Sequence, residues 1–123
     1  MRQTMDLFNE FSSALQFPYY FGRNWPAFSD CLMDLSWLPT QAYFICITSA
    51  EQLLADDDKA SFEKLVHTLQ DVADFWAVDS PNLTAMRRKP APFHILLQVK
   101  QGNEQTMLNK FISLGVSCKR VNL

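Results

Sequence analysis

The chain has 123 residues, of which 48% are hydrophobic and 20% are charged, and its formal net charge at pH 7 is −2. This length suits one domain with a sizeable core, and the composition excludes a disordered chain. The balanced charge argues against nucleic acid as a direct partner, because binding phosphates usually requires a clustered basic face. We therefore expect a single domain over residues 1–123.

The cysteines and the apolar runs limit the compartment and the cofactors. Cys31, Cys46 and Cys118 are widely spaced, and no CxxC pair or cysteine–histidine cluster is present. This pattern favours buried reduced thiols over a zinc site, and reduced thiols fit a cytoplasmic protein. The N-terminal segment lacks the apolar run of a signal peptide, and no run approaches the ~18 residues of a membrane span. We expect no metal, no cofactor and no membrane partner.

Apolar residues at helical spacing predict two helices in the first third of the chain. Thr4 is the candidate N-cap of the first helix, which ends before Pro18. Asn24 is the candidate N-cap of the second helix, which closes at Trp37. The apolar face of the first helix comprises Met5, Phe8, Phe11 and Leu15. In the second helix, Trp25, Phe28, Leu32 and Leu35 form the buried face, and Ser29, Asp30, Met33 and Asp34 form the other side.

The rest of the chain alternates between strand and helix signals. Residues 42–47 form an almost continuous apolar run, which predicts a strand that is covered on both faces. Residues 93–99 predict a second strand, and the more polar residues 116–121 predict a third one at the sheet edge. Helices are predicted after Ser49 through a capping box, over residues 59–77, and after Asn103. This order predicts an α/β fold with a small, mainly parallel sheet.

Two acidic residues are the most informative candidates for function. Asp30 and Asp34 lie four residues apart on the second predicted helix, opposite Phe28 and Leu32. Like charges at this spacing destabilise an isolated helix by about 0.2–0.5 kcal/mol. The pair is consistent with a solvated face and also with a patch that awaits a cationic partner. The side chains that would supply aromatic and polar contacts there are Tyr20, Asn24, Met33 and Trp37.

Other residues offer weaker signals for chemistry. His67 and His94 belong to no Ser-His-Asp, Cys-His or metal-binding arrangement, and no phosphate-binding glycine loop is present. A hydrolase stays open as an alternative, because acidic residues of the second helix and of residues 59–77 could meet in space. These are Asp30, Asp34, Glu63, Asp71 and Asp74. The basic cluster at residues 87–89, in a long loop over residues 79–92, is typical of a solvated segment.

Residues 15–32, LQFPYYFGRNWPAFSDCL, resemble the core motif of the barstar family, small intracellular inhibitors of secreted ribonucleases. The shared positions are an apolar-Pro lead-in, paired aromatics, Gly22, Asn24, Ala27, Phe28 and Asp30-Cys31-Leu32. The resemblance implies a small parallel sheet packed by helices, in agreement with the α/β order. We expect three strands in total, because the added C-terminal helix and strand would replace the family's first strand, which this chain lacks.

The resemblance also implies a function and a set of contacts. Family members insert one helix and its preceding loop into a ribonuclease active site, where acidic side chains take the place of substrate phosphates. The family's principal aspartate falls on Asp30. We expect no catalytic residue, and a protein-binding site that comprises Tyr20, Gly22, Asn24, Ser29, Asp30, Met33 and Asp34.

Three positions depart from the family pattern. Pro26 replaces a second aspartate, Ser29 replaces an aromatic contact, and Arg23 stands where the type member has an acidic residue. The leading hypothesis is a bacterial immunity protein or antitoxin that occludes a basic ribonuclease or nuclease toxin, with no small-molecule substrate. The alternative is an interaction module with the barstar fold and a non-nuclease partner, which the lost charge at Pro26 motivates.

Overall fold

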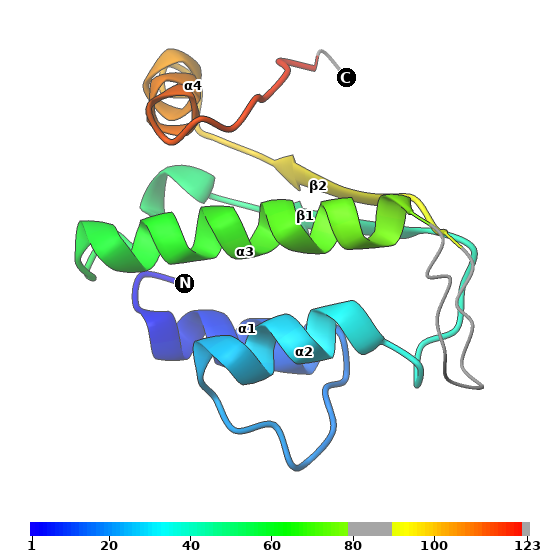
Figure 1. The fold of residues 1–123 in the computed structure, drawn as a ribbon. Coiled ribbons are helices and arrows are strands. Elements are labelled where there is room, and N and C mark those ends of the chain that lie inside the picture. Colours follow the sequence, from blue (N-terminus) through cyan, green and yellow to red (C-terminus); the bar gives the residue numbers. More distant parts are fainter. Residues whose placement is uncertain (79–89, 122–123) are drawn as a thin grey trace.

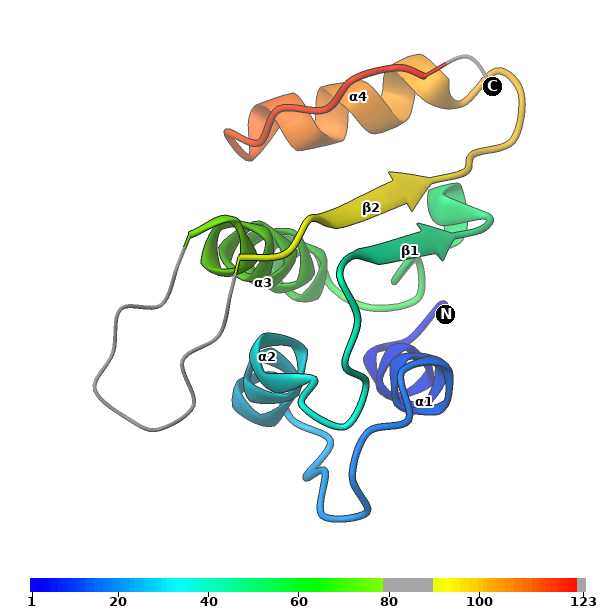
Figure 2. The same ribbon diagram turned by 90° about the vertical axis from the view of Figure 1, so that its right-hand side faces the viewer.

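The computed structural model describes residues 1–78 and 90–121, which form four α-helices, one short 3-10 helix and two strands. Figures 1 and 2 show α1 and α2 at one end of the molecule, α4 at the opposite end, and α3 and the sheet between them. The elements in chain order are α1 (Thr4–Ala14), α2 (Trp25–Asp34), β1 (Tyr43–Ile47), η1 (Ala50–Gln52), α3 (Lys59–Ala77), β2 (Phe93–Leu97) and α4 (Glu104–Ser113).

The two strands pair in parallel, which confirms the predicted α/β class. The register aligns Tyr43 with Phe93 and Ile47 with Leu97. Backbone hydrogen bonds extend the ladder at both ends, from the Tyr43 amide to the Pro92 carbonyl at 2.8 Å and from the Gln98 amide to the Ile47 carbonyl at 2.9 Å. Parallel strands need a long crossover connection, and α3 lies within the one that joins β1 to β2.

The predicted third strand is wrong. In the described part of the chain the sheet has two strands, and residues 116–121 carry none. Gly115 takes a left-handed conformation, with a φ of 75°, and its amide donates to the Ile112 carbonyl at 3.0 Å. The alternating apolar residues after it, Val116 and Cys118, are half-buried against the core instead of pairing with β2. Side-chain burial therefore accounts for the alternation that predicted a strand.

The expected coverage of β1 on both faces is also wrong. Tyr43 and Ile47 are buried, but Phe44 is 68% exposed and Cys46 is exposed. The helices cover one face of the strand, and the side chains on the other face meet solvent. The expectation of buried thiols therefore holds for Cys31 but fails for Cys46.

The helix starts show which local signals were decisive. Asp58 caps α3 by accepting from the Ser61 amide at 3.0 Å. The capping box at Ser49 is absent, because Ser49 takes a left-handed φ of 51° and starts only a 3-10 helix. Thr4 is the first residue of α1 rather than its cap, and its amide donates to the Asp57 carboxylate at 2.6 Å. Asn103 precedes α4 without a side-chain cap.

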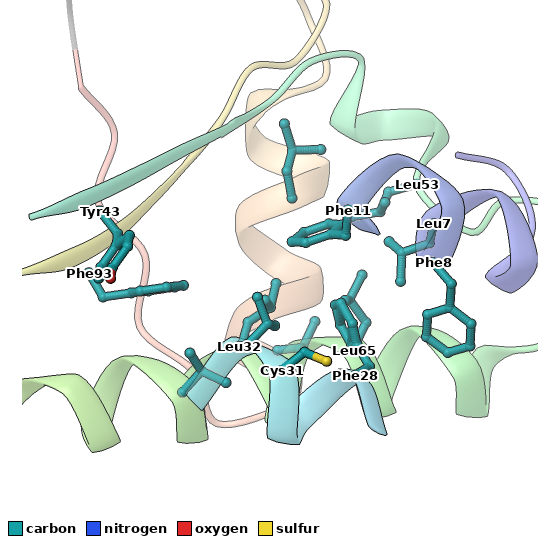
Figure 3. Packing of buried hydrophobic residues seen from close by; sticks show 14 of the residues in the cluster. Leu7, Phe8, Phe11, Phe28, Cys31, Leu32, Tyr43, Leu53, Leu65 and Phe93 are labelled. Carbon is teal, nitrogen blue, oxygen red and sulfur yellow. The ribbon is translucent and has the colours of Figure 1, made fainter. Parts of the chain in front are cut away.

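The core lies between the helices and the covered face of the sheet (Figure 3). The helix predicted over residues 59–77 is confirmed as α3, and its apolar side chains from Phe62 to Trp76 are buried at helical spacing. On α1 the prediction was partly wrong, because Leu7 is fully buried and Met5 is 49% exposed. The largest fully buried side chains are Phe28, Leu7, Leu32, Leu35, Leu65 and Val72. Residues 79–89, with the predicted basic cluster, lie outside the described part.

The cap of α3 predicts a pH dependence of stability. Hydrogen bonds from the Ser61 hydroxyl and amide lower the pKa of Asp58 below its ordinary value of 3.8. A carboxyl with a lowered folded-state pKa stabilises the fold fully above its ordinary pKa, and this contribution is lost as pH falls through the lowered value. We expect Asp58→Asn, which keeps a capping amide, to be less stable than the parent at about pH 7, and the difference to shrink at about pH 3. Urea denaturation at both pH values measures it, and a difference that grows on acidification would contradict the assignment.

Candidate functional site

The loop between α1 and α2 buries one aromatic ring and exposes two. It projects from the end of the molecule where α1 and α2 lie (Figure 1). Phe21 is buried, with ring centroids 5.0 Å from Phe17 and 5.9 Å from Phe8. Tyr19 is 99% exposed and Tyr20 is 68% exposed, and their rings meet edge to face at 5.6 Å. The loop is therefore anchored from within and presents two tyrosines outward.

Gly22 and Asn24 shape the junction between this loop and α2. The Asn24 side chain accepts from the Ala27 amide at 2.8 Å, which confirms it as the N-cap, and it donates to the Gly22 carbonyl at 3.3 Å. A Cβ atom on Gly22 would lie 2.9 Å from the Asn24 side-chain nitrogen. A side chain at position 22 would therefore displace the Asn24 amide from its capping position. Both residues are exposed, and their contacts in the structure maintain the shape of the junction between the loop and α2.

Loss of this cap has a measurable cost. We expect Asn24→Ala to lower the free energy of unfolding by about 1 kcal/mol, because the Ala27 amide loses its acceptor at the start of α2. Asn103→Ala is the matched control, since Asn103 precedes α4 without capping it and should change stability by less than about 0.5 kcal/mol. Urea denaturation of both variants checks this, and equal losses would show that the cap is not the cause.

The outer face of α2 carries the acidic pair that the sequence predicted. Asp30 and Asp34 are exposed, and Ser29 and Met33 are half-buried. Asp34 accepts a hydrogen bond from the Ser36 amide at 3.3 Å, at the end of the helix. The Asp30 carboxylate has no hydrogen bond or ion pair within the described residues. Asp30 is thus the acidic group most free to meet an external cation.

The pKa of the Cys31 thiol reflects the two nearby carboxylates. Burial raises the pKa of the Cys31 thiol, and the negative charges of Asp34 and Asp30 raise it further. A thiol with a raised pKa stays protonated at neutral pH and is a poor nucleophile. Cys31 therefore acts as a small apolar residue beneath the acidic face, and it gives no support to nucleophilic catalysis.

The inner face of α2 is fixed by aromatic packing and by two indole hydrogen bonds. Phe28 is fully buried, with ring centroids 5.0 Å from Phe11 and 5.4 Å from Phe8. The Trp76 indole of α3 donates to the Leu32 carbonyl at 2.9 Å. The Trp37 indole donates to the Leu15 carbonyl at 2.8 Å, which joins the two ends of the loop–helix segment. The acidic face therefore rests on a closely packed and hydrogen-bonded support, which favours a preformed binding surface.

Arg23 adds a positive charge beside this face. It is exposed, its φ is 47°, and its Nε atom donates to the Asn9 side chain of α1 at 3.0 Å. The left-handed conformation is uncommon for a residue with a side chain. The predicted site contains Tyr20 but neither Arg23 nor Tyr19, although the paired aromatics at positions 19 and 20 are a signal for both rings.

The hydrolase alternative gains nothing from the pocket that the structure describes. This pocket of about 300 Å³ lies between the segment around the start of α3 and α4, and its lining includes Phe62, Glu63 and Lys110. Asp30 and Asp34 are not part of it. Among the described residues, no group of three or more acidic, histidine or cysteine side chains could hold a metal ion. No described helix is long and apolar enough to cross a bilayer.

Comparison with known proteins adds one decisive match. A family model described as Barstar (barnase inhibitor) matches residues 1–98. The chain belongs to the barstar family. The barstar match spans α1 to β2, so it includes the loop, α2 and the acidic pair. The segment after residue 98, with α4, lies beyond the barstar match. No curated protein and no solved structure matches the chain.

Proposed function

We propose that this barstar-family protein is an intracellular inhibitor, an immunity protein or antitoxin, that binds and occludes the active site of a basic ribonuclease or nuclease toxin. The observation that carries the proposal is the Asp30 carboxylate, which is exposed on α2 and has no hydrogen bond or ion pair within the described residues. The binding surface extends from Tyr20 in the loop to Met33 and Asp34 at the end of α2. Gly22 and Asn24 hold its shape, and Ser29 lies at its centre.

Electrostatics supports a cationic target. An exposed carboxylate pair on a rigid helix attracts a basic cleft at long range and, once inside it, lies where substrate phosphates would bind. Within the described residues the Asp30 carboxylate makes no hydrogen bond or ion pair that binding would have to break. Binding by this face needs no catalytic residue and no cofactor. It fits a cytoplasmic protein that protects its host by steric occlusion.

An inhibition assay tests the proposal. The purified chain is titrated into barnase, the enzyme named in the family description, and into bacterial nuclease toxins, above all one encoded beside this chain. We expect stoichiometric inhibition of RNA cleavage by at least one of them. We also expect the association rate to fall at least about tenfold between roughly 0.01 M and 0.15 M salt, because the Debye length shrinks from about 30 Å to about 8 Å.

The assay separates the proposal from its alternative. Pro26 is exposed where the family carries a second aspartate, and this is the observation that favours a non-nuclease partner. If no nuclease is inhibited, and pull-down from the native host recovers only non-nuclease proteins, then the chain is an interaction module and the inhibitor assignment is wrong. The result with barnase is especially informative. If the chain does not inhibit barnase but does inhibit another toxin, its target differs from that of the family's type member.

A further inference from the structure

β1 is less covered than its sequence requires. Residues 42–47 form an almost continuous apolar run, a pattern typical of parallel strands with both faces buried. The structure buries only the face that carries Tyr43 and Ile47, and leaves Phe44 68% exposed with Cys46 beside it. Scattered exposed apolar residues are ordinary, but here a buried-type strand lacks half of its cover.

The same strand has an unpaired backbone edge. In a parallel ladder alternate residues direct their amides and carbonyls to the same side. The Tyr43 amide and the Ile47 carbonyl bond to β2, so Phe44 and Cys46 direct theirs to the opposite edge. No described element pairs with that edge. An unpaired edge is a template for another strand, and proteins usually protect it with charges, prolines or bulges.

The edge of β1 has none of these protections. Between Asp34 and Glu51 the chain carries no charged residue, and Pro39 is the nearest proline before the strand. A neutral edge does not repel a second copy of itself, as a row of lysines would. In an antiparallel pair, moreover, the backbone groups of one edge are complementary to those of an identical edge. The free edge of β1 is therefore complementary to the same edge of a second copy of the chain.

We propose that two copies of this chain associate through β1, edge to edge and antiparallel, across a two-fold axis at Ile45. The pairing places Phe44 of each copy opposite Cys46 of the other, and these are the residues whose amides and carbonyls face outward. It joins two two-stranded sheets into one of four strands and brings each Phe44 ring beside the Cys46 side chain of the other copy. The α2 face takes no part, so the dimer and the proposed inhibitor function are independent.

The dimer is expected to be weak, because one strand pair buries less than the roughly 1,600 Å² of a standard interface. Light scattering coupled to size-exclusion chromatography, from about 1 µM to 1 mM, should show the mass of the full chain rising toward twice that of the monomer. Phe44→Lys should raise the dimer dissociation constant at least tenfold, since it adds a charge to the centre of the interface. Ile112→Lys is the matched control, at 65% exposure on α4, and should dimerise like the parent.

Cross-linking locates the contact. In the proposed register the two Cys46 side chains are diagonal neighbours, roughly 7–8 Å apart, within reach of a short bismaleimide. The parent and Cys118→Ala should give a covalent dimer, and Cys46→Ala should not. A monomer at every concentration, equal weakening by Phe44→Lys and Ile112→Lys, or a covalent dimer that persists in Cys46→Ala would each overturn the proposal.

Discussion

Phe28→Ala should lower the free energy of unfolding by about 3–5 kcal/mol, the usual cost of removing a large aromatic ring from a core. Phe28 is fully buried on the inner face of α2 and packs against Phe8, Phe11, Phe17 and Trp25. These rings come from α1, from the loop and from α2 itself. The cavity would therefore open where the three meet, and no single side chain can collapse to fill it. Urea denaturation at low protein concentration measures the loss.

The matched control is Phe44→Ala, which removes the same ring from a side chain that is 68% exposed. It should change the stability of the monomer by no more than about 0.5 kcal/mol. Similar losses at both positions would contradict the packing described for α2. A stable Phe28→Ala variant that still inhibited its target as well as the parent would also show that the aromatic cluster does not support the binding face.

Asp30→Ala should weaken binding to the inhibited nuclease by at least about 2 kcal/mol, or roughly thirtyfold in the dissociation constant. The physical reason is that truncation leaves the cation of the target buried in the complex without its counter-charge. Asp30 has no hydrogen bond or ion pair within the described residues, so the variant should fold like the parent. Stopped-flow kinetics or calorimetry on the pair found by the inhibition assay gives the value.

Asp71→Ala is the matched control for this prediction. Asp71 is also an exposed aspartate within a helix, and the substitution changes the net charge equally. It should reduce the affinity by less than about 0.5 kcal/mol, because only long-range attraction is lost. If Asp30→Ala and Asp71→Ala weaken binding alike, overall charge rather than the α2 face drives association, and the proposed site is wrong.

Local patterns in the sequence were enough to place most elements. Helical periodicity over residues 59–77 predicted α3 with its observed bounds, and Asn24 was correctly identified as an N-cap. Helical periodicity and capping depend on residues within a few positions of each other, so both can be predicted from the sequence alone. The framework of the candidate site followed from the same signals, since the burial of Phe28 and the exposure of Asp30 are set by one helix period.

Features that depend on distant partners could not be predicted in this way. The apolar run at residues 42–47 indicated a strand, but not that one of its faces would stay open. The alternation at residues 116–121 is equally suited to a strand and to a segment packed on a core. Ser49 matched a capping box in sequence, yet the turn after β1 gave it a left-handed conformation that cannot cap. For the site, the contacts assigned to Tyr20, Ser29 and Met33 stay predictions, because the complementary surface belongs to another molecule.

The parallel pairing of β1 with β2 also has a consequence for synthesis of the chain. Tyr43 pairs with Phe93, so fifty residues must be added after β1 before the ladder can begin. At ribosomal rates of about 5–20 residues per second, this takes roughly 3–10 seconds. Throughout that time the apolar run at residues 42–47 has neither its neighbouring strand nor the sequence that completes its covered face. A nascent chain of this protein therefore passes through a stage in which an uncharged apolar segment is emerging while its partner strand is untranslated, and a ribosome-bound chaperone would be expected to act at this stage.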